Sequence, residues 1–265
     1  ISSPIDSNLY SLLAAKMCLS DQGIDLVGVS CLRVLSIRRL VFEAKRLGPS
    51  LIKKIFDKYF LAKPKQQSED HNASLVESYK LEEDSLERLC KISNVKFKKI
   101  IDPNDHRSIA FLSSLKPDLI ISIGSVILRD GFISIPAMGV LNVHKGILPE
   151  YRGMGVTEWP LLHSIKEDEA ELGVTAHLIE RGVDTGPILS KRYLNIDRLE
   201  CIRDIEPKYL EITLLALRDA LDLAKQGFPN MSIQAEGEGK QYFELHHRFK
   251  ELIGMKLEKY FHGKK

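Results

Sequence analysis

Short apolar segments alternate with helical patterns along most of the chain, and this alternation restricts the fold more than any other feature of the sequence. The clearest segment is residues 119–123, which reads Leu-Ile-Ile-Ser-Ile and is followed by Gly124 and Ser125. A strand that is apolar throughout is typical of the centre of a parallel sheet, where helices cover both faces. The pattern therefore predicts an α/β fold.

The opening of the chain predicts a βαβ unit, in which a helix joins two parallel strands. Further strands and helices follow in alternation. The predicted strands are residues 1–3, 26–30, 95–100, 119–123, 139–144, 173–179 and 188–195. The predicted helices are residues 9–22 with Asp6 or Ser7 as N-cap, two between 36 and 61, 85–92, one ending near 115, 204–225 and 242–261. Together they predict a doubly wound, mainly parallel, Rossmann-like sheet with a helical insert near the N-terminus and a helical C-terminal tail.

The length of 265 residues and the 44% of hydrophobic residues predict one main domain with its own core. We place this domain at residues 1–200, with a basic helical insert at 32–75, and expect residues 201–265 to pack on it as a helical extension. The stretch 32–65 holds ten basic and two acidic residues, so it carries +8 in a chain whose net charge is +2. Four interpretations of the insert stay open: a subdomain with solvated charges, a homodimer contact, peripheral binding to an anionic membrane, and binding of the diphosphate of a nucleotide sugar.

Composition excludes several classes of protein. The net charge of +2 gives no reason to expect a nucleic-acid partner, and no apolar run approaches the roughly 18–20 residues of a membrane span. The four cysteines form no Cys-x-x-Cys pair, which predicts reduced thiols and a cytoplasmic location.

Asn142 and His144 end one of the predicted strands and therefore point to the same face of the sheet. In a doubly wound sheet the ligand crevice lies beyond the carboxyl ends of the strands. Asp184 follows a different strand at the same edge, so an amide, an imidazole and a carboxylate are expected to converge. We expect His177, inside that other strand, to have a structural or indirect role.

The trio contains no nucleophilic serine or cysteine and is a poor set of metal ligands, so we expect no metal. It suits acyl transfer to an amine that arrives as its own nucleophile. Asn142 and His144 can donate hydrogen bonds to a tetrahedral oxyanion. Asp184, with His144, can accept and pass on the protons of the attacking amine.

Four ordered motifs surround these residues: Asn-x-His at 142–144, Leu-Pro-x-Tyr-Arg-Gly at 148–153, Gly-Val-Thr-x-His at 173–177 and Asp-Thr-Gly at 184–186. In this order they resemble the 10-formyltetrahydrofolate-dependent formyltransferases, a family that includes the glycinamide ribonucleotide, methionyl-tRNA and sugar N-formyltransferases. The resemblance is strong from residue 117 to 189. It implies a transferase that uses 10-formyltetrahydrofolate as co-substrate, with Asn142, His144 and Asp184 as catalytic residues.

The same resemblance implies a folate site made of backbone groups after the central strand and in the loop before Asp184. Those residues are Ser125, Val126, Ile127, Leu128, Glu180, Arg181, Gly182 and Val183. The residues expected on the acceptor side are Asn8, Lys145, Gly146, Tyr151, Arg152 and Trp159. Arg152 has two interpretations, a bidentate phosphate ligand or a salt bridge that fixes its own loop.

The acceptor implied by the resemblance is a small amine, with a nucleotide-linked amino sugar as the closest fit. Because 81 residues follow Asp184, we expect no C-terminal barrel of the kind normal in tRNA-acting members. The first loop, residues 3–8, lacks the glycines that cradle a phosphate in glycinamide ribonucleotide enzymes and carries an acid instead. The alternatives are those two transferases, a formyltetrahydrofolate hydrolase, and a folate- or nucleotide-sugar-binding protein without activity.

Overall fold

A computed structural model describes residues 1–33, 68–124, 126–163, 171–196 and 205–263. Its main layer is a sheet in the order β3-β2-β1-β4-β5-β7-β8, since a parallel bridge between Ser2 and Ser122 connects the two halves. The strands of this layer are β1 (Ser2–Ser3), β2 (Gly28–Leu32), β3 (Lys96–Ile100), β4 (Ile120–Ile121), β5 (Val140–His144), β7 (Leu172–Leu178) and β8 (Ile188–Leu194). Only the pairings of β7 with its two neighbours are antiparallel, so the prediction of a mainly parallel α/β sheet is confirmed.

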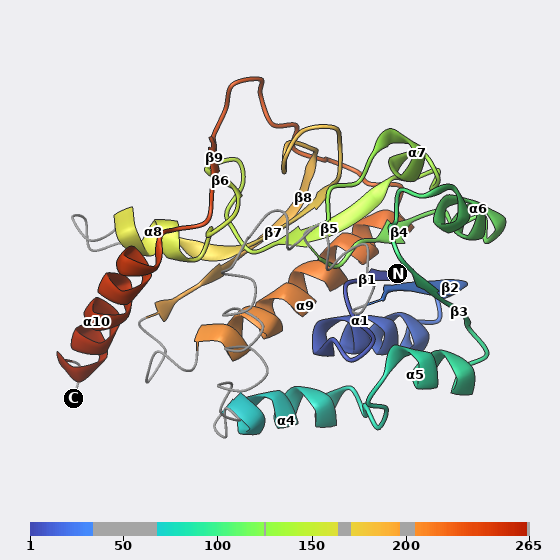
Figure 1. Cartoon of the computed structure of the whole chain (residues 1–265), viewed down its shortest axis with the longest axis horizontal. Helices are drawn as coiled ribbons and strands as arrows, with labels where there is room; N and C mark the ends of the chain where they lie inside the picture. The colour runs from blue at the N-terminus through green and yellow to red at the C-terminus, as the bar shows by residue number, and fades with distance from the viewer. Residues whose placement is uncertain (34–67, 125, 164–170, 197–204, 264–265) are drawn as a thin grey trace, which may run out of the picture.

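Helices cover both faces of this sheet. The described helices are α1 (Leu9–Ser20), α4 (Ser68–Ser78), α5 (Leu86–Ile92), α6 (His106–Ser114), α7 (Asp130–Ile133), α8 (Glu158–His163), α9 (Ile205–Lys225) and α10 (His247–Gly263). Figure 1 shows α1 and α9 along one side of the sheet and α6 and α7 on the other. The helix α10 packs on α8, at the end of the molecule away from α6.

The alternation of side chains along the strands separates two hydrophobic clusters. Ile121 and Leu141 belong to the large cluster that includes α1 and α9, whereas Ile120 and Val140 belong to a small cluster with α6 and α7. Successive side chains of a strand point to opposite faces, which explains why adjacent residues join different clusters. Because Tyr209 of α9 is fully buried in the large cluster, this C-terminal helix is part of the main core.

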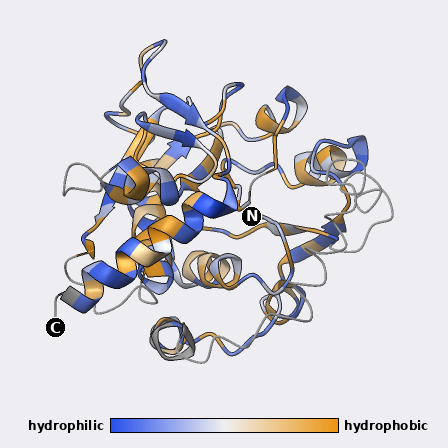
Figure 2. Ribbon diagram, turned by 60° about the vertical axis from the view of Figure 1, so that its left-hand side comes forward, coloured by the Kyte–Doolittle hydropathy of each residue, from blue (hydrophilic) through white to orange (hydrophobic). Residues whose placement is uncertain are grey.

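A second, two-stranded layer was not predicted. The strand β6 (Tyr151–Gly153) pairs in parallel with β9 (Lys240–Tyr242), and both are hydrophilic in Figure 2. The predicted C-terminal helix at 242–261 is therefore wrong at its start, because Tyr242 lies in a strand and the helix begins at His247. The pairing joins segments almost ninety residues apart, so no local sequence pattern predicts it.

The N-cap of α1 is also a correction, because it is Asn8 and neither Asp6 nor Ser7. The Asn8 Oδ1 atom accepts hydrogen bonds from the backbone N–H and the hydroxyl of Ser11, both at 2.8 Å. Asp6 is used elsewhere, since its carboxylate accepts the Glu87 N–H at 3.0 Å, at the start of α5. The first loop is thus tied to α1 and α5.

Several predictions lie outside the described residues: the two helices of the basic insert with their homodimer and membrane interpretations, Ser125 and Cys201. Three cysteines, Cys18, Cys31 and Cys90, are buried free thiols, as the sequence predicted. Among the described residues we find neither a helix long and apolar enough to cross a membrane nor a cluster of three or more side chains suited to a metal ion.

Candidate active site

Two neighbouring antiparallel strands place three polar side chains on one face of the sheet. In the antiparallel register of β5 and β7, Asn142 lies opposite His177, and His144 lies opposite Thr175. The Asn142 Nδ2 atom is 3.3 Å from Nε2 of His177, and the two histidine rings lie edge to face with centroids 6.3 Å apart. The register of one strand pair therefore builds most of the site.

Asp184 lies between the two histidines, as its carboxylate faces both rings. Its Oδ2 atom is 3.5 Å from Nδ1 of His144, and its Oδ1 atom is 3.6 Å from Nε2 of His177. Asn142, His144 and Asp184 thus converge, together with His177. The predicted route was wrong, because β7 is antiparallel to β5 and its carboxyl end lies beside the start of β5, away from the edge where β5 ends at His144. The side chain of Asp184 is 17% exposed and that of His144 is 8% exposed, so the group is shielded and still reachable from solvent.

His177 is the deepest member of the group and is 1% exposed. Burial lowers the pKa of His177 from 6.5 to about 4, although the Asp184 carboxylate opposes the shift. The ring is therefore neutral near pH 7. Its Nδ1–H donates to the Leu178 carbonyl at 2.9 Å, so Nε2 is the acceptor for the Asn142 amide. This bond fixes which end of the Asn142 side chain faces His177.

The loop after β5 is held close to His144. Thr175 accepts a hydrogen bond from the Leu148 N–H at 3.0 Å and donates one to the Gly146 carbonyl at 2.8 Å. A Cβ atom at Gly146 would lie 2.9 Å from Nε2 of His144 and 2.8 Å from the Tyr151 carbonyl, so only glycine fits. Nε2 of His144 lies 2.8 Å from the Tyr151 carbonyl oxygen. Because a carbonyl oxygen only accepts, Nε2 of His144 carries the proton and donates in this hydrogen bond.

The opposite side of Asp184 is held by residues that the sequence did not reveal. The Gly153 N–H donates to Oδ2 of Asp184 at 2.8 Å. Gln234 donates to the main-chain carbonyls of Asp184 and Gly186 at 3.0 and 2.7 Å. Gln234 lies between α9 and β9, in a segment with no motif and no regular periodicity, so no signal in the sequence marks it.

The segment after the central strand, where folate contacts were predicted, is partly exposed. Val126 and Ile127 are 41% and 79% exposed, whereas Leu128 is buried in the cluster under α6 and α7. The missed residue here is Asn104, whose side chain donates to the Ile127 carbonyl at 2.9 Å and accepts from the Arg129 N–H at 2.7 Å. One amide therefore fixes the backbone that the family resemblance assigns to folate recognition.

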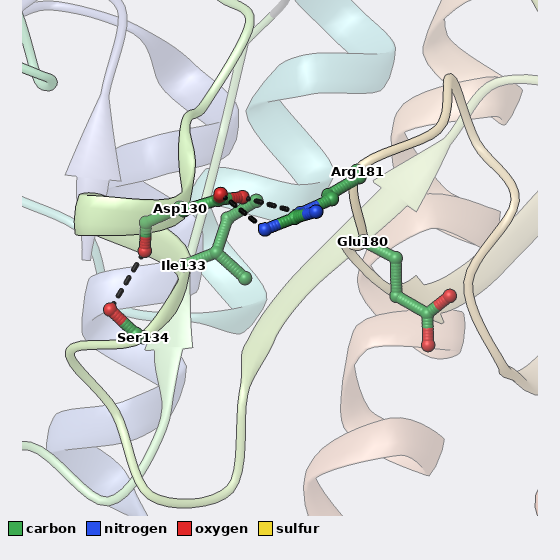
Figure 3. Close-up of a pocket in the computed structure, with 5 residues that line it drawn as sticks. All are labelled: Asp130, Ile133, Ser134, Glu180 and Arg181. Carbon is green, nitrogen blue, oxygen red and sulfur yellow. Dashed lines mark hydrogen bonds and ion pairs between the residues drawn. The ribbon is translucent and has the colours of Figure 1, made fainter.

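A pocket of about 410 Å³ lies between α7 and the loop before Asp184, lined by Asp130, Ile133, Ser134, Glu180 and Arg181. Figure 3 shows Arg181 reaching to Asp130, with two hydrogen bonds of 2.6 and 3.0 Å, while the Glu180 side chain points away from this ion pair. The lining of the pocket does not include Asn142, His144 or Asp184. Gly182 and Val183, which are exposed, continue the same loop to Asp184.

The predicted acceptor residues fall into two groups. Tyr151 and Trp159 belong to a cluster of four rings with Tyr242 and His163, whose closest centroids are 5.1–5.9 Å apart. The Trp159 indole N–H donates to the Phe243 carbonyl at 2.8 Å. We name these four residues the aromatic cluster; the Tyr151 carbonyl connects it directly to His144.

The remaining acceptor residues are engaged in structural contacts. Lys145 is 2.9 Å from Glu206, and Asn8 caps α1. Arg152 donates through Nε and Nη2 to Oε1 of Gln234 at 3.2 and 2.7 Å, so the salt bridge offered as one interpretation of this residue is replaced by hydrogen bonds to a neutral amide.

Comparison with known proteins identifies the family. The sequence profile of the formyl transferase family (Formyl_trans_N) matches residues 36–221, so the chain belongs to this family. A methionyl-tRNA formyltransferase of Pelobacter propionicus is 33% identical over 132 residues, a match of 48% of this chain and 40% of the relative. The chain therefore spans less than half the length of this curated relative.

Two solved structures share the fold at low sequence identity. The phosphoribosylglycinamide formyltransferase of Anaplasma phagocytophilum is 15% identical, with a TM-score of 0.54 over 91% of this chain and 97% of the other. WlaRD, a sugar 3N-formyltransferase, is 15% identical, with a TM-score of 0.51 over 91% of this chain and 68% of the other. At this identity the likeness concerns the fold alone.

Proposed function

We propose that the protein moves a formyl group from 10-formyltetrahydrofolate to the amine of a nucleotide-linked amino sugar. The observation that carries the proposal is the convergence of Asn142, His144 and Asp184, with the carboxylate 3.5 Å from the imidazole, in a member of the formyl transferase family.

The geometry supports direct attack by the acceptor amine. The amine nitrogen forms a bond to the formyl carbon, the carbonyl oxygen becomes an oxyanion, and the bond to N10 of the folate then breaks. Asn142 uses one N–H toward His177, so the second N–H of the same amide serves the oxyanion. The His144 Nε2–H joins it when that N–H turns from the Tyr151 carbonyl to the oxyanion. Asp184 accepts the proton that the amine loses and passes it on to N10 of the folate, which leaves as the protonated amine.

We expect the contact between His144 and Asp184 to shorten when the reacting complex forms. A distance of 3.5 Å exceeds the roughly 2.7–3.2 Å of a good hydrogen bond. Catalytic hydrogen bonds are often long before substrate binds and shorten in the reacting complex.

The pocket between α7 and residues 180–181 supports the folate part of the proposal. It is an open depression of the surface with a volume of about 410 Å³. Three exposed apolar residues lie near this lining in the sequence. Val126 and Ile127 come before α7, and Val183 comes after Arg181. A flat pterin with its benzoyl group suits such a surface, with Glu180 to Val183 and residues 126–128 as backbone partners.

The aromatic cluster supports an acceptor with a planar group. Its rings lie on the β6–β9 side of the site, and Tyr151, Trp159 and Tyr242 are each partly exposed. A nucleobase can stack on such rings at about 1–3 kcal/mol per base. The first loop argues against glycinamide ribonucleotide, because Asn8 caps α1 and the Asp6 carboxylate adds negative charge where a phosphate would bind.

Methionyl-tRNA is the second candidate acceptor. The curated relatives named methionyl-tRNA formyltransferases, at 28–33% identity, favour it. The solved structures with this fold include both sugar- and ribonucleotide-acting enzymes, so the fold does not choose between acceptors.

The test is a panel of acceptors. The protein is incubated with 10-formyltetrahydrofolate and, separately, with nucleotide-linked amino sugars, glycinamide ribonucleotide and methionyl-tRNA, and mass spectrometry follows the gain of one formyl group. We expect a formyl adduct on a sugar nucleotide. An adduct on methionyl-tRNA alone would overturn the acceptor, and folate deformylated without any adduct would indicate a hydrolase.

A further inference from the structure

Gln234 has a side-chain amide in which both ends are engaged. Its Oε1 accepts two hydrogen bonds from the Arg152 guanidinium, at 2.7 and 3.2 Å, and its Nε2 donates to two main-chain carbonyls, at 3.0 and 2.7 Å. A guanidinium has only donors and a carbonyl has only acceptors. The neighbours therefore determine the orientation of this amide, which would have to break all four bonds in order to flip.

The two carbonyls belong to the loop that carries the catalytic carboxylate, because they are those of Asp184 and Gly186. Arg152 belongs to β6, and its neighbour Gly153 donates its N–H to Oδ2 of Asp184. Gln234 thus connects the main chain of the Asp184 loop with the strand that holds the Asp184 side chain.

Asp184 needs such support, since its φ angle of 54° is in the left-handed region that L-residues with a Cβ rarely adopt. A residue in this region stays there only when its surroundings hold it, at a cost of order 1–3 kcal/mol. The carboxylate itself reaches His144 across 3.5 Å, so a small shift of the loop changes that contact.

We propose that Gln234 is a positioning residue that sets the place of the Asp184 carboxylate relative to His144; this rests on the proposed catalytic role of Asp184. Gln234 does not touch the reacting atoms in this arrangement. It acts through the two carbonyls of the loop and through Arg152.

Two variants separate these contacts. In Gln234→Met the side chain keeps its length and loses all four hydrogen bonds. In Gln234→Glu the acceptor for Arg152 remains, but an anionic oxygen replaces the donor and faces the carbonyls of Asp184 and Gly186. The matched control is Gln226→Met, because Gln226 is exposed and its side chain donates to the Asp222 carbonyl one turn earlier.

We expect kcat, normalised to the number of folate-binding sites, to fall about 10- to 100-fold in both variants, since misplacement of a catalytic group by about 1 Å can cost 10² in rate. The KM values for folate and acceptor stay near wild type, and Gln226→Met stays near wild type in all respects. Wild-type kcat in both variants would overturn the proposal. If Gln234→Met unfolds, Gln234→Glu decides, since it keeps the bond to Arg152.

A readout that needs no activity distinguishes failure of this proposal from failure of the proposed function. The amide proton resonance of Gly153 reports the hydrogen bond to Asp184. We expect it to shift upfield and to lose exchange protection in both Gln234 variants, even if the wild type formylates no tested acceptor. An unchanged Gly153 resonance would overturn the positioning role, whereas an inactive wild type would overturn the proposed function only.

Discussion

The two sides of Asp184 are built by different means. On one side, the regular strands β5 and β7 hold His144 and His177, whose positions follow from the register of a single strand pair. On the other side, Gly153 and Gln234 come from a three-residue strand and an irregular segment that meet only through long-range pairing. The first side includes Asn142 and His144, which are proposed for the chemistry, and the second side supplies the hydrogen bonds that fix the carboxylate.

The difference predicts which substitutions abolish the reaction and which only lower its rate. Loss of a group on the strand side removes a catalytic contact. Loss of a group on the β6–β9 side leaves every catalytic group present and alters only where Asp184 lies. The following predictions test this division, from the largest expected effect to the smallest.

Replacement of His144 by alanine has the largest expected effect. We expect kcat to fall by about 10²–10³, the usual cost of one oxyanion donor, while the affinity for folate is retained. Steady-state kinetics and folate titration measure the two quantities. The control is His106→Ala, which removes an exposed histidine at the start of α6. Turnover at the wild-type rate in His144→Ala would contradict the site.

The burial of His177 predicts a loss of stability in acid. Its pKa is about 4 in the folded protein and 6.5 when exposed, so below pH 6.5 the unfolded chain binds a proton that the folded chain does not. The free energy of unfolding therefore falls between pH 6.5 and 4, by up to about 3 kcal/mol from this group. Denaturant titrations at pH 7, 5.5 and 4 measure it. In His177→Gln we expect the free energy of unfolding to depend less on pH between 6.5 and 4. The same pH dependence as in the wild type would show that His177 is protonated in the folded state.

Much of the strand side could be predicted from sequence, because it depends on local patterns. The alternation of apolar segments indicated the sheet, and Asn142 and His144 share a face because they are two residues apart on a strand. The β6–β9 side could not be predicted, because Gly153 and Tyr242 meet across almost ninety residues and Gln234 has no periodic or motif signal. The N-cap of α1 was predicted wrongly for a different reason. Asp, Ser and Asn are nearly equal as N-caps, and Asp6 instead accepts a hydrogen bond at the start of α5, so Asn8 is the N-cap.

A pair of glycines tests how closely β6 packs on β9. Gly153 and Gly227 both have positive φ angles, 90° and 75°, but a Cβ at Gly153 would overlap the Tyr242 carbonyl oxygen, whereas a Cβ at Gly227 would meet nothing within 4 Å. We expect Gly153→Ala to lower the free energy of unfolding by about 2 kcal/mol more than Gly227→Ala, because overpacking adds to the shared backbone strain. Denaturant titration compares them, and equal losses would mean that the two strands are not closely packed.

The ion pair between Arg181 and Asp130 has the smallest expected effect. The side chains are 85% and 63% exposed, and such pairs contribute about 0–1 kcal/mol. We therefore expect Arg181→Gln to change folate affinity by less than about fivefold and to leave kcat unchanged. Calorimetric titration with tetrahydrofolate measures this. A much larger loss would show that this pair, and not the backbone of residues 180–183, controls the pocket.

The most direct test of the central claim follows the formyl carbon itself. 10-Formyltetrahydrofolate labelled with ¹³C in the formyl group is mixed with the protein and an amino-sugar nucleotide, and the label is observed by NMR. The account predicts that the signal moves to a sugar formamide at a rate that depends on His144 and Asp184. Label that appears only as free formate, or that stays on the folate with every acceptor, would contradict it.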